Sequence, residues 1–383
     1  MQFAARTTQL IHSPIGAATG LLADRRDSRP LLNLSQAAPS FAPPPEIAAR
    51  IRAAGSEPEA SRYTLQPGIA SVRAAVAEDL SQTYAAAVAA DDVVITAGCN
   101  QAFCAVINAV AGPGDNVVLV VPFYFNHDMW LRVEGIEPRY VHPAADLVPT
   151  VDEIAAVMDD RTRAVTIVTP GNPSGAITPP ERISDIADLC AERDVALVLD
   201  ETYRSYRGTD EPAHRLFDRP AWRDTVVSLH SFSKDLAIPG YRVGAIVAGE
   251  RLRVEALKIL DCVTICAPSL GQLAVETGLR ECGDWRAAQA DRILGLQRAF
   301  EAMMAARPGG FELVGAGAYF GWVAHHRDRP TVDVVKQLLV DHSVLTIPGI
   351  AFTPTDEGMI RFSFANLDPD ELPELRLRLG ELP

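Results

Sequence analysis

Runs of consecutive Val, Ile, Leu and Ala residues restrict the fold of this chain more than any other feature. The runs are continuous rather than alternating, which is typical of strands buried on both faces, as in a sheet covered by helices. They are VVIT at 93–96, VVLVV at 117–121, AVTIVT at 164–169, VALVL at 195–199, TVVSL at 225–229 and VGAIVA at 243–248. We therefore predict a central sheet built from these segments.

Segments with helical periodicity lie before and between these runs. Residues 69–80 place four aliphatic side chains on one face, and residues 100–111 form a second helix that a Gly-Pro-Gly turn ends. In residues 178–193, Thr178 and Glu181 have the spacing of a capping box, which predicts a helix start. Alternation of strands and helices specifies an α/β fold with a mostly parallel central sheet flanked by helices.

The two ends of the chain differ from its middle in their pattern of predicted helices and strands. Residues 1–45 are Pro-rich and irregular, whereas beyond about residue 270 long helices precede the strand-like segments AYFGWVAHH and MIRFSFA. We therefore expect a large α/β domain at 46–270 and a smaller α+β domain made of 1–45 and 271–383.

Composition narrows the class of protein. The 383 residues are 48% hydrophobic and 22% charged, as in soluble globular proteins, and the net charge of −14 argues against nucleic acid or an anionic membrane as main partner. No secretory signal and no apolar run of membrane-spanning length is present. The six cysteines form no CxxC pair and no metal-like spacing with histidine. We expect a cytoplasmic protein that binds no metal.

Lysine is rare in this chain, with only Lys234, Lys258 and Lys336 present. The last two lie in runs with helical apolar spacing and are expected on the surface. Lys234 follows the strand TVVSL in a turn punctuated by Gly and Pro, where α/β sheets place their chemistry. A lysine there can form a Schiff base with a carbonyl. The alternative is an ordinary surface lysine in an arginine-rich chain.

Polar residues follow the other predicted strands. Asp200 ends VALVL, where a carboxylate can pair with a cationic ring nitrogen, and Tyr203 can reach the same ligand. Asn172, in the turn GNPSG after AVTIVT, can donate to an oxygen anion. A solvated acidic turn and a turn favoured by its composition are the structural alternatives.

Other residues suit a phosphate and a flat ring. Gly98, between a strand and a helix, lets the backbone approach a phosphate. Ser231 and Arg242 offer a hydroxyl and a guanidinium fork for the same group. Tyr124 or Phe125, at another strand end, can stack on a ring. A tight turn and core aromatic residues would give the same patterns.

Arg361 lies between apolar residues of the segment MIRFSFA. An arginine in a buried strand needs an anionic partner, which is either a substrate carboxylate or an internal Asp or Glu. A phosphate cradle, an acid for a ring nitrogen, a Schiff-base lysine and this arginine together describe a pyridoxal phosphate site that acts on an amino acid.

From about residue 30 to the C-terminus, the chain resembles the fold-type I, class I/II aminotransferases, the family of aspartate, aromatic and kynurenine aminotransferases. The resemblance rests on YTLQPGIASVR, TAGCNQAF, PFYF and MIRFSFA, and above all on the combination of NPSG, DETY and SFSK with an arginine eight residues after the lysine.

The resemblance implies a role for each site residue. Lys234 would bind pyridoxal 5'-phosphate as a Schiff base and carry protons, and Asp200 would keep the pyridine nitrogen protonated. Tyr203 would hydrogen-bond the phenolic oxygen, Tyr124 would stack on the ring, and Arg361 would bind the substrate α-carboxylate. Asn172 would contact both cofactor and substrate. The phosphate would be held by Gly98, Cys99, Asn100, Ser231 and Arg242.

The resemblance also implies partners. The substrates would be an amino acid and a 2-oxo acid that react alternately by a ping-pong mechanism. Tyr63 resembles a residue that reaches the phosphate of the neighbouring subunit, which implies a homodimer with shared active sites.

The sequence departs from the family pattern at two places. Ala37 stands where the family often has a glycine that contacts substrate, and Asn126 and His127 follow the stacking aromatic as polar residues expected to face the substrate. Three alternatives share parts of this pattern. They are a pyridoxal phosphate-dependent lyase, cyclase or oxidase, a non-catalytic regulator, and a nicotinamide dehydrogenase, for which the chain lacks GxGxxG after an early strand.

Overall fold

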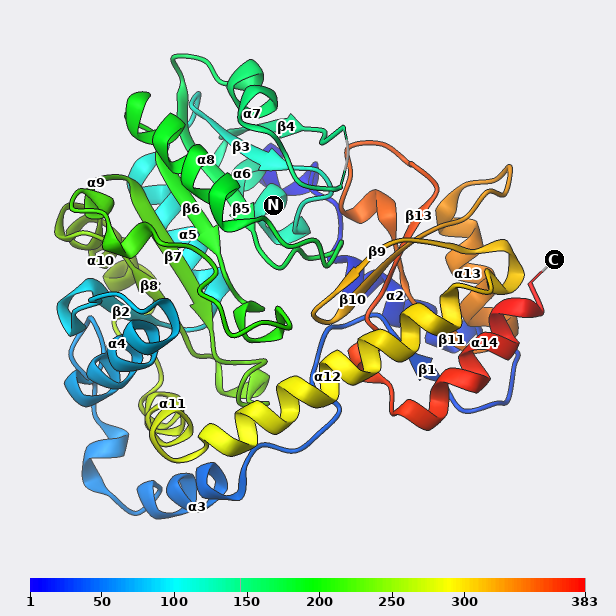
Figure 1. Cartoon of the computed structure of the whole chain (residues 1–383), viewed down its shortest axis with the longest axis horizontal. Coiled ribbons are helices and arrows are strands. Elements are labelled where there is room, and N and C mark those ends of the chain that lie inside the picture. The colour runs from blue at the N-terminus through cyan, green and yellow to red at the C-terminus, as the bar shows by residue number, and fades with distance from the viewer. Residues whose placement is uncertain (145, 383) are drawn as a thin grey trace.

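The computed structural model describes residues 1–144 and 146–382. Figure 1 shows two bodies, a large sheet wrapped in helices and a smaller group of strands and helices, and the long helix α12 (Gly283–Met304) runs from one to the other. The domain limits given above, 46–270 and 1–45 plus 271–383, stay a prediction.

The large body contains a seven-stranded sheet in the order β2-β8-β7-β6-β5-β3-β4. Only β8 runs against its neighbours, so the prediction of a mostly parallel central sheet is confirmed. The strands are β2 (Val93–Thr96), β3 (Asn116–Val120), β4 (Glu137–Val141), β5 (Thr162–Val168), β6 (Ala196–Asp200), β7 (Val226–Ser231) and β8 (Gly244–Val247).

Neighbouring residues of these strands pack into two different cores. Val118 and Leu197 belong to the core on one face of the sheet, and Val117 and Val198 belong to the core on the other. This double burial explains the continuous apolar runs. The edge strand β4, with the sequence EPRYV, was not predicted because most of it is partly exposed and no apolar run marks it.

The helices of the large body pack on both faces of the sheet or on one another. They are α3 (Pro45–Ala54), α4 (Ala70–Tyr84), α5 (Cys99–Val110), α6 (Phe125–Glu134), α7 (Val151–Val157), α8 (Pro180–Glu192), α9 (Trp222–Thr225), α10 (Glu250–Val263) and α11 (Ser269–Glu281). The capping box predicted at Thr178 and Glu181 is wrong. Helix α8 begins at Pro180 with Pro179 as its N-cap, and no side chain caps it.

The small body has an antiparallel sheet in the order β12-β13-β10-β9 and a separate parallel pair, β1 with β11. Residues 1–45 are more regular than their composition predicted, since they contain two short helices and β1. The elements are α1 (Ala5–Thr8), α2 (Pro14–Gly20), β1 (Leu32–Asn33), β9 (Glu312–Gly317), β10 (Phe320–Ala324), α13 (Thr331–His342), β11 (Val344–Leu345), β12 (Ile347–Pro348), β13 (Met359–Phe362) and α14 (Leu372–Gly380).

Parallel strands β3, β5, β6 and β7 end at one edge of the large sheet, which faces the small body (Figure 1). The loops after these strands carry the polar residues that the sequence singled out. Within residues 1–144 and 146–382, no helix combines the length and apolar composition needed to cross a membrane.

Candidate active site

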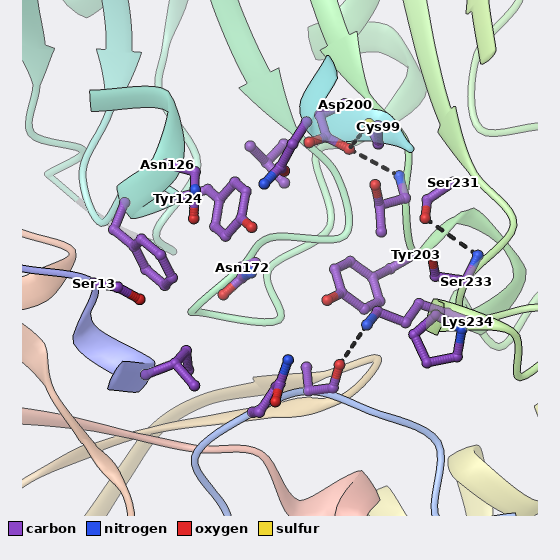
Figure 2. A pocket seen from close by; sticks show the side chains of 18 of the residues that line it. Ser13, Cys99, Tyr124, Asn126, Asn172, Asp200, Tyr203, Ser231, Ser233 and Lys234 are labelled. Carbon is purple, nitrogen blue, oxygen red and sulfur yellow. Dashed lines mark hydrogen bonds between the residues drawn. The ribbon is translucent and has the colours of Figure 1, made fainter. Parts of the chain in front are cut away.

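A cavity of about 540 Å³ lies at this edge of the sheet. Its size is typical of small-molecule sites. Helix α2 and the strand β13 also contribute to its lining. Figure 2 shows residues from distant segments converging on it, among them Ser13, Asn172 and Lys234. Of the residues proposed from the sequence, the lining includes Ala37, Cys99, Asn100, Tyr124, Asn126, Asn172, Asp200, Tyr203, Ser231, Lys234, Arg242 and Arg361.

Lys234 is the only one of the chain's three lysines that is not exposed. Its ammonium group donates a hydrogen bond to the carbonyl oxygen of Ala37 (Figure 2). Burial, together with the positive charges of Arg361 and Arg242, lowers the pKa of Lys234 to about 8. Lys258, by contrast, lies on the surface and pairs with Glu255 at 2.7 Å. Lys234 is therefore the amine best suited to nucleophilic chemistry.

We expect the reactivity of Lys234 to rise with pH around a midpoint near 8, because only the neutral amine attacks a carbonyl. At pH 7 about a tenth of this lysine is neutral, against roughly one part in a thousand or less for an ordinary lysine. Modification of cofactor-free protein by an aldehyde, followed by peptide mapping across pH, measures the midpoint. Arg361→Met removes one positive neighbour and is expected to move the midpoint upward. A wild-type midpoint above about 10 would contradict this assignment.

Asp200, at the end of β6, is 4% exposed. Burial acts to raise its pKa, but the hydrogen bond and charge of His127 and the Thr202 amide lower the pKa below its ordinary value. His127 Nε2 lies 3.3 Å from Asp200 Oδ2, and the Thr202 amide donates to Oδ1 at 3.0 Å. Asp200 is therefore an ionised carboxylate in a site otherwise poor in negative charge.

The expectation that His127 faces the substrate is wrong. Its ring is 2% exposed and stacks on Phe103, with ring centroids 3.8 Å apart, behind Asp200. The reason is helical geometry, because consecutive residues of α6 point in different directions, and of His127 and Asn126 it is Asn126 that lines the cavity. His127 therefore orients the carboxylate.

The start of α5 forms an anion cradle. Gly98, its N-cap, has φ of 90°, and a Cβ there would lie 2.3 Å from Arg242 Nη2. Glycine therefore allows the arginine to lie against the free amide groups of the first helical turn. Arg242 donates to the Pro239 carbonyl oxygen at 3.0 Å, and no carboxylate of the described residues forms an ion pair with it.

Two hydroxyl groups complete this end of the cavity. The Ser231 Oγ accepts a hydrogen bond from the Ser233 amide at 3.3 Å, and both serines line the cavity (Figure 2). Ser233 and Thr202 were not proposed from the sequence. The signal for Ser233 was its place in the same SFSK motif, two residues after Ser231.

Asn172, Tyr203 and Tyr124 lie around the middle of the cavity (Figure 2). The Asn172 Oδ1 accepts from Arg361 Nη1 at 2.9 Å, so its amide nitrogen is the group left to donate to a ligand. Burial raises the pKa of Tyr203 well above its ordinary value and that of Tyr124 to about 12. Both phenols therefore remain neutral hydrogen-bond donors at physiological pH.

Arg361, on β13, is 2% exposed and lies between Phe320 and Phe352, whose ring centroids are 5.1 and 4.8 Å from its Cζ. Burial lowers its pKa to about 10, so the guanidinium stays charged near neutral pH. Its guanidinium donates hydrogen bonds to the Asn172 amide oxygen and the Ser35 carbonyl oxygen, and its Nε has no hydrogen-bond partner among the described residues. No Asp or Glu of the described residues forms an ion pair with it. The structure therefore contradicts the internal-acid alternative within the described residues.

Helix α2 lines the cavity with residues that the sequence did not single out. They are Ile15, Gly16 and Thr19, with Ser13 just before the helix and Gln36 further along. No motif marks this Gly- and Ala-rich segment. Tyr63, in contrast, is 78% exposed and does not line the cavity within its own chain.

Comparison with known proteins agrees with this geometry. The family model of aminotransferase class I and II matches residues 29–379. The chain belongs to this family. An aromatic aminotransferase of Arabidopsis thaliana is 30% identical over 91% of this chain and 88% of its own length. The valine–pyruvate aminotransferase of Mycobacterium tuberculosis is also 30% identical, over 91% and 90%.

A solved aminotransferase structure from Mycobacterium tuberculosis has a TM-score of 0.89 and 26% identity, covering 99% of this aminotransferase and 98% of that chain. The fold class predicted from the sequence, the enzyme class and the dependence on pyridoxal phosphate are thus confirmed. The relatives are named aminotransferases, so the lyase, cyclase or oxidase alternative is not favoured.

The residues of this aminotransferase fit the cofactor. A helix start whose glycine makes room for Arg242 suits a phosphate group. The ionised Asp200 suits a protonated ring nitrogen, and a lysine with a lowered pKa lies in the same cavity.

Proposed function

We propose that this cavity is the transamination site and that Lys234 is the lysine that binds the cofactor and moves the substrate proton. The observation that carries the proposal is a lysine of lowered pKa in one cavity with an ionised aspartate and a buried arginine that lacks an acid. When bound, pyridoxal phosphate supplies an electron sink. The amino acid and the 2-oxo acid would use the site in turn.

The other side chains have distinct roles in this proposal. Asp200 holds a proton on the ring nitrogen, and Tyr203 and Asn172 donate to the phenolic oxygen. Tyr124 packs on the ring, and Ala37 lines the substrate side of the cavity while its carbonyl holds Lys234. The phosphate is bound by Gly98, Cys99, Asn100, Ser231 and Arg242.

Borohydride reduction of the holoenzyme tests the central assignment. Reduction makes the lysine–cofactor bond permanent, and we expect peptide mapping to find the label on Lys234. A label on Lys258 or Lys336 would contradict the proposal. Stoichiometric pyridoxamine phosphate after addition of one amino acid would separately confirm transfer of the amino group.

Arg361→Ala is expected to weaken binding of the amino acid about 10- to 150-fold, with a much smaller effect on cofactor binding. A charge-assisted hydrogen-bonded pair is worth about 1.5–3 kcal/mol. Spectral titration of the bound cofactor with substrate measures the dissociation constant. Arg361→Lys keeps the charge without the planar fork, so its loss should be intermediate. Equal use of amines that lack a carboxylate would contradict this role.

We further propose a homodimer with shared active sites. Tyr63, Leu65, Val263 and Ile265 are large apolar residues that are all exposed in the single chain. Tyr63 lines one surface hollow together with Thr264, Cys266 and Pro268, and Leu65, Val263 and Ile265 lie within two residues of this lining along the chain. Ile265 also has φ of 67°, an uncommon conformation for a β-branched residue. Several large apolar side chains left exposed around one hollow are typical of a protein interface.

In this dimer, Tyr63 of one subunit would bind the phosphate in the other. Tyr63→Phe is therefore expected to weaken cofactor retention about 10- to 100-fold, the value of one hydrogen bond to a charged group. A mixed dimer of Tyr63→Phe and Lys234→Ala subunits has one site with both changes and one site with neither. We expect the mixed dimer to recover one wild-type site, measured by cofactor retention and activity. A fully active monomer in sedimentation would contradict the proposal.

The cytoplasm is the proposed location. All six cysteines are free thiols, and three of them are buried. Reduced thiols are typical of cytosolic proteins.

A further inference from the structure

The charged residues around the cavity indicate which side chain the amino donor has, provided that the function proposed above is correct. We propose that the amino donor has an uncharged side chain, which binds against a surface formed by Ile15, Phe125 and Asn126. We call these three residues the side-chain wall.

The described part of the cavity lining contains four charged side chains, Asp200, Lys234, Arg242 and Arg361. In the proposed function the first three bind the cofactor, and Arg361 binds the α-carboxylate. A second carboxylate on the substrate would therefore find no cation of this chain to pair with. The remaining lining residues are uncharged.

The surroundings of the carboxylate-binding arginine are apolar. Phe352 lies against the Arg361 guanidinium, and Phe125 meets Phe352 edge-on, with ring centroids 5.6 Å apart at 60°. Ile15 and Ala18 of α2 belong to the same apolar cluster as these two phenylalanines. A side chain that extends from a carboxylate held by Arg361 thus meets an apolar surface.

The wall lies on the side of the cavity away from Lys234. In Figure 2, Ser13, Tyr124 and Asn126 are on one side of Asn172, whereas Lys234 and Ser231 are on the other. Apart from Tyr124 and Asn172 itself, the cofactor-binding residues labelled there lie on the Lys234 side; they are Cys99, Asp200, Tyr203 and Ser231. The side formed by α2 and α6 is left for the substrate. Asn126 adds an uncharged polar group there.

Desolvation decides between a charged and an uncharged donor. Moving a carboxylate into such surroundings without a cationic partner costs much more than moving an amide or an alkyl group. Glutamine and glutamate have nearly the same shape, as do asparagine and aspartate, so a preference within each pair reports this difference in charge.

The test is the donor half-reaction of the holoenzyme, followed by the absorbance of the bound cofactor. We expect kcat/KM for glutamine and asparagine to exceed the values for glutamate and aspartate by about tenfold or more. Valerate and glutarate, which have equal length and differ by one carboxylate, provide a binding measurement without chemistry. Valerate should bind more tightly. A preference for the acidic member of the pairs would overturn the inference. This holds whether the cation that pairs with the second carboxylate came from this subunit or from its partner.

A gain of charge tests the wall itself. Asn126→Arg is expected to raise the glutamate-to-glutamine ratio of kcat/KM about tenfold, because it supplies the missing cation. Asn126→Leu is the control, and we expect it to leave glutamate disfavoured. If Asn126→Arg left the glutamate-to-glutamine ratio of kcat/KM unchanged, Asn126 would not contact the donor's side chain and the side-chain wall would be wrong at this residue.

Failure of the inference is distinguishable from failure of the proposed function. An enzyme that carries the borohydride label on Lys234 but prefers acidic donors would contradict only the inference. An enzyme that reacts with no amino donor and carries no label on Lys234 would contradict the proposed function.

Discussion

Lys234→Ala is expected to lower turnover by about 10⁴-fold or more, the largest effect of any single substitution proposed here. The variant loses both the covalent attachment of the cofactor and the group that moves the substrate proton, and proton transfer alone contributes about 10²–10⁴-fold. No other lysine lies near the cavity to replace it. Single-turnover kinetics with a saturating amino donor measure the loss.

Lys258→Ala is the matched control for this experiment. The same atoms are removed from an exposed helix position whose side chain pairs with Glu255, so activity should remain at the wild-type level. Turnover of Lys234→Ala within tenfold of wild type would rule out Lys234 as the catalytic lysine.

Asp200→Asn is expected to lower turnover about 10²–10³-fold while the protein keeps the cofactor. The change removes the buried negative charge that holds a proton on the ring nitrogen, and loss of one oriented electrostatic group costs about this much. The phosphate-binding residues and Lys234 remain, so the absorbance of the bound cofactor should persist while single-turnover rates fall.

Asp128→Asn is the control for this second experiment. Asp128 is also a buried aspartate, but it binds Arg132 and Tyr140 and does not line the cavity. We expect its variant to turn over substrate at nearly the wild-type rate. Near-normal turnover in Asp200→Asn would show that the reaction does not depend on the charge of this carboxylate.

Much of the large sheet was predictable from sequence because a strand buried on both faces is a continuous run of apolar residues. Six of its seven strands coincide with the continuous apolar runs. The half-exposed strand β4 has no such run and was missed. The capping box at Thr178 failed because the start of α8 is fixed by two prolines rather than by a side-chain hydrogen bond.

The chemistry of the site was also readable where it depends on residue type. Lys234, Asp200 and Arg361 could be proposed because an amine, a carboxylate and a guanidinium each follow or lie within a buried strand. Parallel strands bring their carboxyl ends to one edge, so residues far apart in the chain were expected to meet there.

Only the tertiary structure decided which direction each side chain takes and what surrounds it. His127 and Asn126 are neighbours in sequence, yet one lies behind Asp200 and the other lines the cavity. An ion pair between Arg361 and an acid of the same chain could be ruled out only once the neighbours of Arg361 were known. Helix α2 lines the cavity although no sequence motif marks it. The sequence by itself determined which groups are present and the sheet that carries them. Burial, packing and charge around each group arise from contacts between distant segments, and local patterns do not record those contacts.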